Sequence, residues 1–244
     1  MVMDDLRSIM RDVFGDSDCE CEDRELALQL PDHLHTSLTE CQRWQWNSFD
    51  KIKGLWLCSE FLSPMGQVNL LSSIHREGWF AEDSCNQAMR FGDLPSWSIE
   101  LSISTQKALT VLMKLKMDEY VLPAYIWERE PLFDQLVVNV YQPGEGICDH
   151  TDLMRFEDGI AIFSLESACV MDFTKPGGNS LVGGSAVGVP VLLDPGSLVI
   201  LSGEARYRWK HGINREPGFQ VWEGLELNQK RRTSVTLRKL CQNT

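Results

Sequence analysis

Residues 139–152 read Asn-Val-Tyr-Gln-Pro-Gly-Glu-Gly-Ile-Cys-Asp-His-Thr-Asp, and this stretch carries the strongest signal in the chain. It ends with an imidazole, His150, and a carboxylate, Asp152, two positions apart. Residues two apart on an extended segment point to the same side, so a single strand would present both to one metal ion. His211, in Trp-Lys-His-Gly-Ile, lies in the apolar C-terminal half and offers a third ligand. Two histidines and one carboxylate form the facial triad of non-haem Fe(II) oxygenases.

A row of polar side chains near these ligands is suited to bind a carboxylate. Asn139 and Tyr141 alternate along residues 135–141, so both face the side opposite to the valines between them. Alternate residues of a second strand also share one face, namely Arg232, Ser234, Thr236 and Arg238. A planar guanidinium favours a two-point pair with a carboxylate. Beside an iron site, two such arginines indicate capture of a dicarboxylate, and the alternative is a solvated strand face.

Four motifs follow one another along the chain. Asn-x-Tyr-x-Pro-Gly-x-x-Ile-x-x-His-x-Asp is followed by Ser-Leu at 164–165, by Gly-Glu-x-Arg-x-x-x-x-His-Gly-Ile and by Arg-x-Ser-x-Thr-x-Arg. Together they resemble the AlkB family of Fe(II)- and 2-oxoglutarate-dependent dioxygenases, over roughly residues 54–240. Three short motifs are most similar to those of the family member that hydroxylates a modified wobble uridine in tRNA: Val170–Phe173, Gly203–Tyr207 and Arg232–Ser234.

The resemblance implies a set of ligands for each cofactor. Fe(II) would be held by His150, Asp152 and His211, and O2 would take a position that these ligands leave open. The distal carboxylate of 2-oxoglutarate would pair with Arg232. The remaining cosubstrate contacts that the resemblance implies are Asn139, Tyr141, Ser234 and Arg238. Because Ser234 stands where some family members have asparagine, its contact with the cosubstrate is expected to differ.

The resemblance also points to residues near the substrate. Arg90 and Phe91 lie in a segment that is similar to the family's substrate lid, although packing is an equal alternative for Phe91. Arg206 and Trp209 precede His211 at positions that, in the family, line the pocket or support the iron-binding carboxylate. For Arg206 we favour the supporting role.

Length and composition are those of one soluble globular domain with a sizeable core. No run approaches the ~18 apolar residues that a membrane span requires, and no basic segment leads into an apolar stretch as in a signal peptide. Eight cysteines without secretory context indicate reduced thiols in the cytoplasm or nucleus. Cys19 and Cys21 lack a second pair at zinc-finger spacing, so we interpret them as incidental. We expect a monomer without membrane contact.

The net charge of −12 is unevenly distributed. Residues 1–50 hold twelve acidic and four basic residues, a net charge of −8. Residues 205–240 hold nine basic and three acidic residues, a net charge of +6. Basic residues therefore gather beside the predicted site, at Arg206, Arg208, Lys210, Arg215, Lys230 and Arg231. This asymmetry is compatible with contact to phosphates, and the alternative is a mixed surface with an acidic tail.

The order of expected elements predicts an α+β fold that is mainly β. We expect an acidic extension over residues 1–50, partly disordered or packed on the core, and a catalytic domain over residues 51–244. Ser63 and Pro64 predict the start of a helix that ends near Gly78. A second helix is expected over residues 95–117, and residues 79–94 are expected to be irregular. Strands are expected at 54–58, 135–141, 160–165, 169–173, 189–193, 198–201 and 234–240.

A helical layer followed by many short strands predicts a double-stranded β-helix, or jelly roll, of two sheets with helices packed outside. On this fold, the motifs predict a dioxygenase that hydroxylates or demethylates a modified nucleobase, in RNA or single-stranded DNA, with tRNA favoured. The alternatives are a protein or small-molecule hydroxylase on the same fold and a binding module that has lost its metal.

Overall fold

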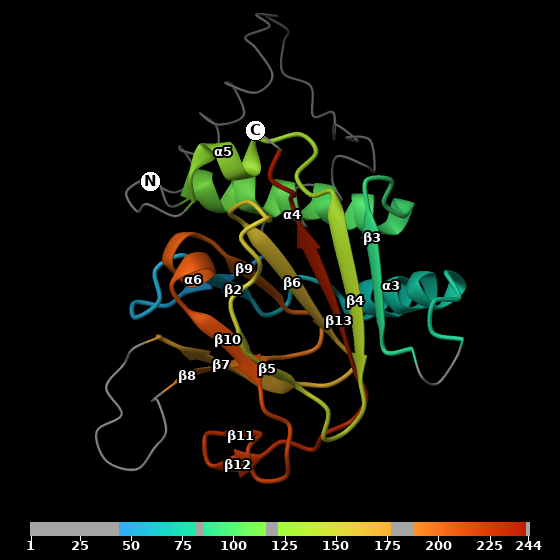
Figure 1. The fold of residues 1–244 in the computed structure, drawn as a ribbon, viewed down its shortest axis with the longest axis vertical. Helices are drawn as coiled ribbons and strands as arrows, with labels where there is room; N and C mark the ends of the chain where they lie inside the picture. The colour runs from blue at the N-terminus through green and yellow to red at the C-terminus, as the bar shows by residue number, and fades with distance from the viewer. Residues whose placement is uncertain (1–43, 82–84, 116–121, 177–187, 243–244) are drawn as a thin grey trace, which may run out of the picture. The chain divides into compact units, whose positions relative to one another are not determined.

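The structure of the protein is a computed structural model that describes residues 44–81, 85–115, 122–176 and 188–242. Among these residues, seven antiparallel strands form the larger of two main sheets (Figure 1). Their order across the sheet is β1 (Trp46–Ser48), β2 (Leu55–Cys58), β9 (Leu198–Leu201), β6 (Ile160–Leu165), β13 (Arg232–Arg238), β4 (Gln135–Tyr141) and β3 (Gln87–Phe91).

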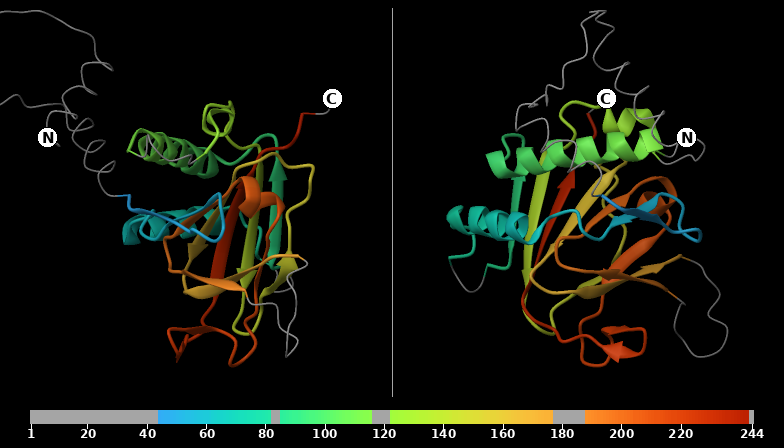
Figure 2. Two further views of the ribbon diagram at one scale, coloured as in Figure 1. Left: turned by 90° about the vertical axis from the view of Figure 1, so that its left-hand side faces the viewer. Right: turned by 180° about the vertical axis from the view of Figure 1, so that it is seen from behind.

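A smaller sheet lies against the larger one (Figures 1 and 2). Its order, within the described residues, is β5 (Ile147–His150), β10 (Lys210–Ile213), β7 (Cys169–Thr174) and β8 (Val189–Leu193). A short hairpin of β11 (Val221–Trp222) and β12 (Leu225–Glu226) lies between β10 and β13 in the chain. The space between the two sheets is filled by an apolar core that includes Ile160 and Ile162 of β6 with Met171 and Phe173 of β7.

Helices cover the other face of the larger sheet, as Figure 2 shows for α3 (Pro64–Arg76) and α4 (Ser96–Leu115). A second core cluster packs Leu70 of α3 and Leu109 of α4 against Leu136 and Val138 of β4. Because side chains alternate along a strand, Asn139 is left facing the smaller sheet. Two shorter helices complete the described part of the fold, α5 (Ala124–Trp127) and α6 (Gly203–Tyr207). The predicted jelly roll with helices outside is confirmed.

Most predicted elements of the catalytic domain are observed. The Ser63 side chain accepts a hydrogen bond from the nitrogen of Gly66 at 3.1 Å, which caps α3 as expected. Gly78 follows α3 with a φ of +69°, a conformation that suits glycine. Within the described residues, no helix is long and apolar enough to span a membrane. Residues 1–43 lie outside the described ranges, so the expectations for the acidic extension and for Cys19 and Cys21 stay predictions.

Two differences from the prediction bear on the site. The last strand, β13, runs from Arg232 to Arg238 rather than over residues 234–240, because its hydrogen bonds follow the full length of β4. Residues 79–94, expected to be irregular, contain the edge strand β3. Its sequence, Gln-Ala-Met-Arg-Phe, lacks β-branched residues, and pairing with β4 holds it extended, which local propensity does not reveal.

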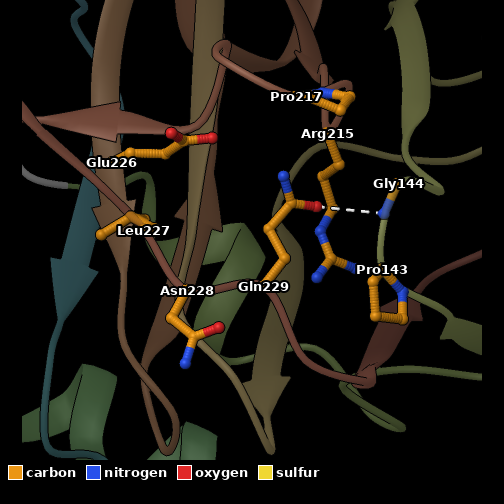
Figure 3. Close-up of a pocket in the computed structure, with 8 residues that line it drawn as sticks. All are labelled: Pro143, Gly144, Arg215, Pro217, Glu226, Leu227, Asn228 and Gln229. Atoms are coloured by element: carbon orange, nitrogen blue, oxygen red, sulfur yellow. Dashed lines mark hydrogen bonds between the residues drawn. The ribbon is translucent and has the colours of Figure 1, made fainter.

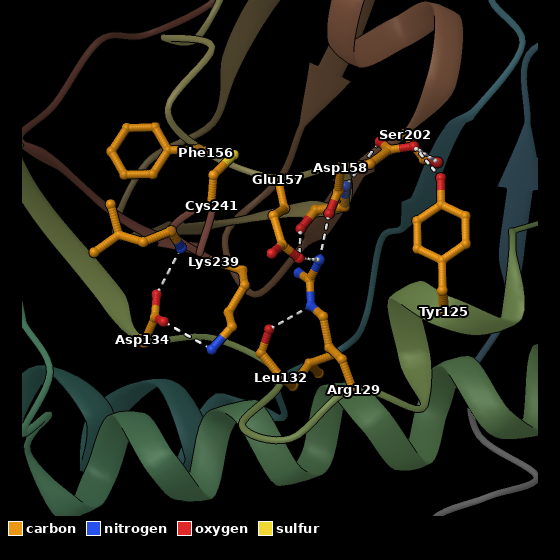
Figure 4. Close-up of polar contacts among 12 residues, drawn as sticks. Tyr125, Arg129, Leu132, Asp134, Phe156, Glu157, Asp158, Ser202, Lys239 and Cys241 are labelled. Atoms are coloured by element: carbon orange, nitrogen blue, oxygen red, sulfur yellow. Dashed lines mark hydrogen bonds and ion pairs between the residues drawn. The ribbon is translucent and has the colours of Figure 1, made fainter. Parts of the chain in front are cut away.

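Buried polar contacts tie the segment after β5 to its neighbours (Figure 4). The guanidinium of Arg129 donates to the backbone oxygens of Asp158 and Gly159, at 2.6 and 3.1 Å. The Asp158 carboxylate accepts hydrogen bonds from the nitrogen of Gly203 and the hydroxyl of Ser202. Asp158 is buried, and its contacts join this segment to the start of α6.

Candidate metal and cosubstrate site

The three predicted metal ligands come together between the two sheets. His150 and His211 are direct partners across β5 and β10, with ring centroids 4.4 Å apart. An Asp152 carboxylate oxygen lies 3.6 Å from Nε2 of His211. One ligand atom from each of the three residues lies within 4.8 Å of the others. Their mutual distances therefore suit coordination of one ion.

Asp152 is placed differently from the expectation that one strand carries both ligands. β5 ends at His150, and Asp152 lies two residues beyond it. Its backbone is held by the buried Arg206, whose guanidinium donates to the carbonyl of Asp152 at 3.0 Å and to two further carbonyls of the following turn, at Leu153 and Phe156. Tertiary contacts rather than strand pleat orient this carboxylate. These contacts are those that the expected supporting role of Arg206 requires, and the role itself stays a prediction.

The Asp152 carboxylate retains one free acceptor. Its Oδ1 pairs with the guanidinium of Arg238 at 2.5 Å. Its Oδ2 is buried and accepts no hydrogen bond. A buried carboxylate oxygen without a partner is costly, and a cation bound beside the two imidazoles would satisfy it. The residues present therefore fit a divalent metal ion.

Both imidazoles can offer a ring nitrogen to a metal ion. Nδ1 of His150 lies 2.9 Å from the backbone oxygen of Cys148. When Nδ1 donates its hydrogen to this oxygen, the lone pair of Nε2 is free to bind a metal ion. The pKa of His211 is lowered to about 4, mainly by burial; Asp152 acts against this shift, and His150, Arg238 and Arg206 act with it. His211 is consequently uncharged at neutral pH, the form that coordinates metals.

The metal-free protein should lose stability in mild acid because of His211. When unfolded, this histidine binds a proton below about pH 6.5, but in the fold its pKa is about 4. Between these values the unfolded state binds more protons, so the free energy of unfolding falls as the pH drops through that window, by on the order of 3 kcal/mol in total. Urea unfolding at pH 7, 6 and 5 measures this slope. In the His211→Gln variant, the free energy of unfolding should depend less on pH. The same pH dependence in both proteins would contradict the low pKa of His211.

The predicted cosubstrate residues line a cavity next to this cluster. From the larger sheet it receives the polar row Asn139, Tyr141, Arg232, Ser234, Thr236 and Arg238. Apolar residues close it, including Ile162 and Met171, and His150 and His211 border it. The strand register explains the row, because Arg232 pairs with Tyr141 and Ser234 pairs with Asn139 across β13 and β4.

Arg232 is the most unusual group in this cavity. The side chain is 1% exposed, and its Nη2 donates to the hydroxyl of Ser164 at 2.7 Å. Its Nε has no hydrogen-bond partner, and no carboxylate forms an ion pair with it within the described ranges. A buried guanidinium without an anion is unfavourable. The cavity is thus suited to a ligand that brings its own carboxylate, as 2-oxoglutarate would.

Gln87 is a neighbour of this site that sequence patterns missed. Its side-chain nitrogen donates to Oδ1 of Asn139 at 2.6 Å, which leaves the Asn139 amide free to donate into the cavity. Burial raises the pKa of Tyr141, so its hydroxyl remains a donor as well. The only sequence signal for Gln87 is its alternation with Met89 on β3, and that strand was not predicted.

The four residues expected near the substrate, Arg90, Phe91, Arg206 and Trp209, lie in different surroundings in the structure. Phe91 is 47% exposed, and Arg90 lies with its guanidinium 4.4 Å from the ring of Trp79. Since Arg90 and Phe91 are neighbours on β3, they face opposite sides of the sheet, and Phe91 shares the side of the cavity. Trp209 is 8% exposed and belongs to the core between the sheets. Of the four, only Phe91 keeps a place beside the cavity with its side chain exposed.

The predicted basic cluster is smaller than its sequence suggests. Arg206 and Arg215 are each 1% exposed. Arg215 donates to the backbone oxygens of Gln142 and Lys230, at 3.2 and 2.6 Å, and borders a separate hollow under residues 226–229 (Figure 3). Both arginines are therefore unavailable to phosphates, because backbone carbonyls occupy them. The cationic side chains that remain exposed are Arg208, Lys210, Lys230 and Arg231.

Comparisons with known proteins agree with this geometry. A family model described as "2OG-Fe(II) oxygenase superfamily" matches residues 104–238. The tRNA (carboxymethyluridine(34)-5-O)-methyltransferase alkbh8 of Xenopus tropicalis is 32% identical over 215 residues, which cover 77% of this chain and 32% of that protein. The Arabidopsis thaliana protein named "Alkylated DNA repair protein ALKBH8 homolog" is 28% identical, covering 89% of this chain and 66% of that one. This chain therefore spans about a third of the frog protein's length.

A solved structure supports the fold. The structure titled "The structure of OsALKBH1" superposes with a TM-score of 0.55 at 17% sequence identity, covering 77% of this chain and 98% of that chain. At this level of identity the likeness concerns the arrangement of sheets and helices. It agrees with the jelly roll described above.

Proposed function

The chain belongs to the 2OG-Fe(II) oxygenase superfamily, in its AlkB branch, and from that premise we propose that it hydroxylates or demethylates a modified nucleobase, with RNA, and tRNA in particular, favoured over DNA. Members of this superfamily are oxidoreductases that use Fe(II), 2-oxoglutarate and O2. The observation that carries the proposal is the buried Arg232, which lacks a carboxylate partner and lies in a cavity bordered by the clustered His150 and His211.

Residues at one end of the cavity would bind the iron, and residues at the other end would bind 2-oxoglutarate. His150, Asp152 and His211 would hold the iron, and Arg206 and Arg238 would keep the Asp152 carboxylate in place. Arg232 would bind the distal carboxylate of 2-oxoglutarate, with hydrogen bonds from Tyr141 and Asn139. When bound, Fe(II), 2-oxoglutarate and O2 would together supply an oxidant that replaces a substrate C–H bond with C–OH.

The fate of the alcohol depends on the substrate atom that carries it. A hydroxymethyl group on nitrogen breaks down, releasing formaldehyde and the unmodified base, whereas an alcohol on a carbon without such a nitrogen persists. The same residues therefore serve demethylation and stable hydroxylation. The apolar wall of the cavity, including Ile162 and Met171, limits the access of water to the reacting groups.

Support for an RNA substrate comes from the relatives and from charge. The frog and mouse relatives are both named as tRNA-modifying proteins, and three motifs are most similar to those of the family's tRNA hydroxylase. The family model matched here is an oxygenase model, so we propose no methyltransferase activity for this chain. The direct experiment incubates total RNA with the purified protein, Fe(II) and 2-oxoglutarate. Nucleoside mass spectrometry should then show one modified nucleoside consumed and one oxidised or demethylated nucleoside formed, relative to a heat-inactivated control.

RNA binding should weaken steeply as salt is added. The exposed cations Arg208, Lys210 and Lys230 would contact phosphates, and each contact releases counterions on binding. Replacing all three with alanine should lower the affinity for RNA by about tenfold at low salt and reduce the slope of log affinity against log salt. Conversion of 2-oxoglutarate in the absence of RNA should stay unchanged, because none of the three lines the cavity.

A triple variant with the same loss of charge elsewhere serves as the control. Lys51, Lys53 and Lys107 are exposed and do not line the cavity. Their replacement by alanine should change RNA affinity much less. Salt-insensitive binding, or no binding to any RNA or single-stranded DNA tested, would instead favour a protein or small-molecule substrate.

A further inference from the structure

The cavity-facing side of the larger sheet extends beyond the cavity to its open edge. Across β3, β4 and β13, Met89 pairs with Val137, which pairs with Thr236 of the cavity wall. Two residues further along β3, Phe91 pairs with Gln135 of β4, which pairs with Arg238 of β13. Paired residues share a face of the sheet. Met89 and Phe91 therefore continue the floor of the site, and they are 46% and 47% exposed.

The turn that follows Asp152 borders this floor. Leu153 and Met154 are 60% and 71% exposed, although they stand next to a buried metal ligand. Their exposure does not reflect a loose backbone, because Arg206 binds the carbonyl of Leu153 and the nitrogen of Cys241 donates to the carbonyl of Arg155 at 2.9 Å. The fold thus holds in place a turn whose apolar side chains are exposed, near the exposed Met89 and Phe91.

The charge at this place is positive. The Arg155 guanidinium carbon lies 6.0 Å from the ring centroid of Phe91 and 5.1 Å from that of Phe156. Arg238 already pairs with Asp152. Glu157 pairs with Arg129, and within the described ranges no carboxylate forms an ion pair with Arg155. Arg155 is therefore an exposed cation beside an aromatic ring, and no carboxylate in the described part of the chain pairs with it.

We propose that Phe91, Met89 and Arg155 form the substrate-recognition surface of the site, on which a base that is uncharged or anionic stacks while Arg155 binds an anionic group of the same nucleotide. This inference rests on the proposed function. A base alkylated on a ring nitrogen so that it carries a positive charge is disfavoured, because Arg155 repels it. The anionic group is either the adjacent phosphate or an acidic substituent of the base.

The experiment measures binding of labelled RNA hairpins to the full-length protein by fluorescence anisotropy. Two hairpins differ at one position, one carrying neutral N3-methyluridine and the other cationic N3-methylcytidine, which differ in charge and in the group at C4. A second pair carries anionic 5-carboxymethyluridine or neutral 5-methyluridine. The wild-type protein should prefer N3-methyluridine over N3-methylcytidine. Preference for the cationic base would overturn the proposal.

Variants identify the residues and the source of the anion. Phe91→Ala should weaken binding of the preferred hairpins roughly fivefold or more, as loss of one base–aromatic stack does. Arg155→Ala should weaken it by about two- to fivefold, and Arg155→Glu should reverse the preference between the neutral and cationic bases. An equal loss for both uridines in the second pair assigns the anion to the phosphate, whereas a loss confined to 5-carboxymethyluridine assigns it to the base.

Matched controls separate this proposal from the proposed function. Phe219→Ala and Arg76→Ala remove the same side chains at exposed positions on the loop before β11 and on α3, and both should bind RNA as the wild type does. If the wild type binds none of the hairpins, the proposed function fails. If it binds them and the Phe91 and Arg155 variants bind equally well with unchanged preference, only the recognition surface is wrong.

Discussion

Replacing His150 with alanine should abolish the conversion of 2-oxoglutarate to succinate, to below about 1% of the wild-type rate. Loss of a group that merely supports a metal ligand costs about 10- to 100-fold, so loss of a ligand itself should cost more. The side chain is only half-buried, and its one hydrogen bond is to the carbonyl of Cys148. The fold should therefore survive. Succinate is measured by mass spectrometry, and Fe(II) binding by titration without oxygen.

His75 provides the matched control for this variant. It is exposed in the last turn of α3 and borders no part of the cavity. His75→Ala should leave both turnover and Fe(II) binding unchanged, while His150→Ala should lose both with an unchanged melting curve of the metal-free protein. Wild-type turnover in the His150 variant would falsify the assignment of His150, Asp152 and His211 as the iron site.

Arg232→Lys should raise the concentration of 2-oxoglutarate needed for half-maximal turnover by roughly ten- to a hundredfold. Lysine keeps the charge but lacks the planar fork that meets a carboxylate at two points. A hydrogen bond to a charged group contributes about 1.5–3 kcal/mol, which corresponds to that range. Because the ligands His150, Asp152 and His211 are untouched, the maximal rate should change much less. Direct binding of 2-oxoglutarate by calorimetry should show the same loss of affinity.

Arg215→Lys distinguishes this effect from general damage to a buried arginine. Arg215 is as deeply buried as Arg232, but its guanidinium donates to backbone carbonyls and does not line the cosubstrate cavity. Its replacement should lower the melting temperature with little effect on 2-oxoglutarate affinity. Equal affinities in the Arg232 and Arg215 variants would mean that Arg232 serves only the packing of the sheets.

The alternation of residue types was enough to predict the polar row of the cavity. Asn139 and Tyr141, like Arg232 and Ser234, occupy every second position of a strand, and a strand has only two faces. Once a strand is recognised, its polar face follows without knowledge of its neighbours. The observed register then places these two pairs of residues opposite each other. The helix cap at Ser63 was predictable for a similar reason, because the capping contact lies within three residues.

The alternation of residue types does not predict the role of a side chain whose hydrogen-bond partners are backbone groups far away in the sequence. Arg215 was counted with the surface cations, and so was Arg206 despite the supporting role expected for it, yet each is surrounded by carbonyls from segments that lie elsewhere in the chain. Arginine is most often exposed, and burial of its charge depends on acceptors that only the fold brings near.

The sequence by itself determined which residues are available as ligands and which strand faces carry them, since residue identity and the two-residue repeat are local properties. Tertiary structure alone decided which of these residues meet. Asp152 reaches the two histidines because Arg206 and Arg238 hold it beyond the end of β5. β3, with Gln87 and Phe91, exists because β4 pairs with it. The position of Asp152 and the formation of β3 both depend on contacts between segments that are distant in the sequence. These contacts stabilise the protein only once the chain has folded.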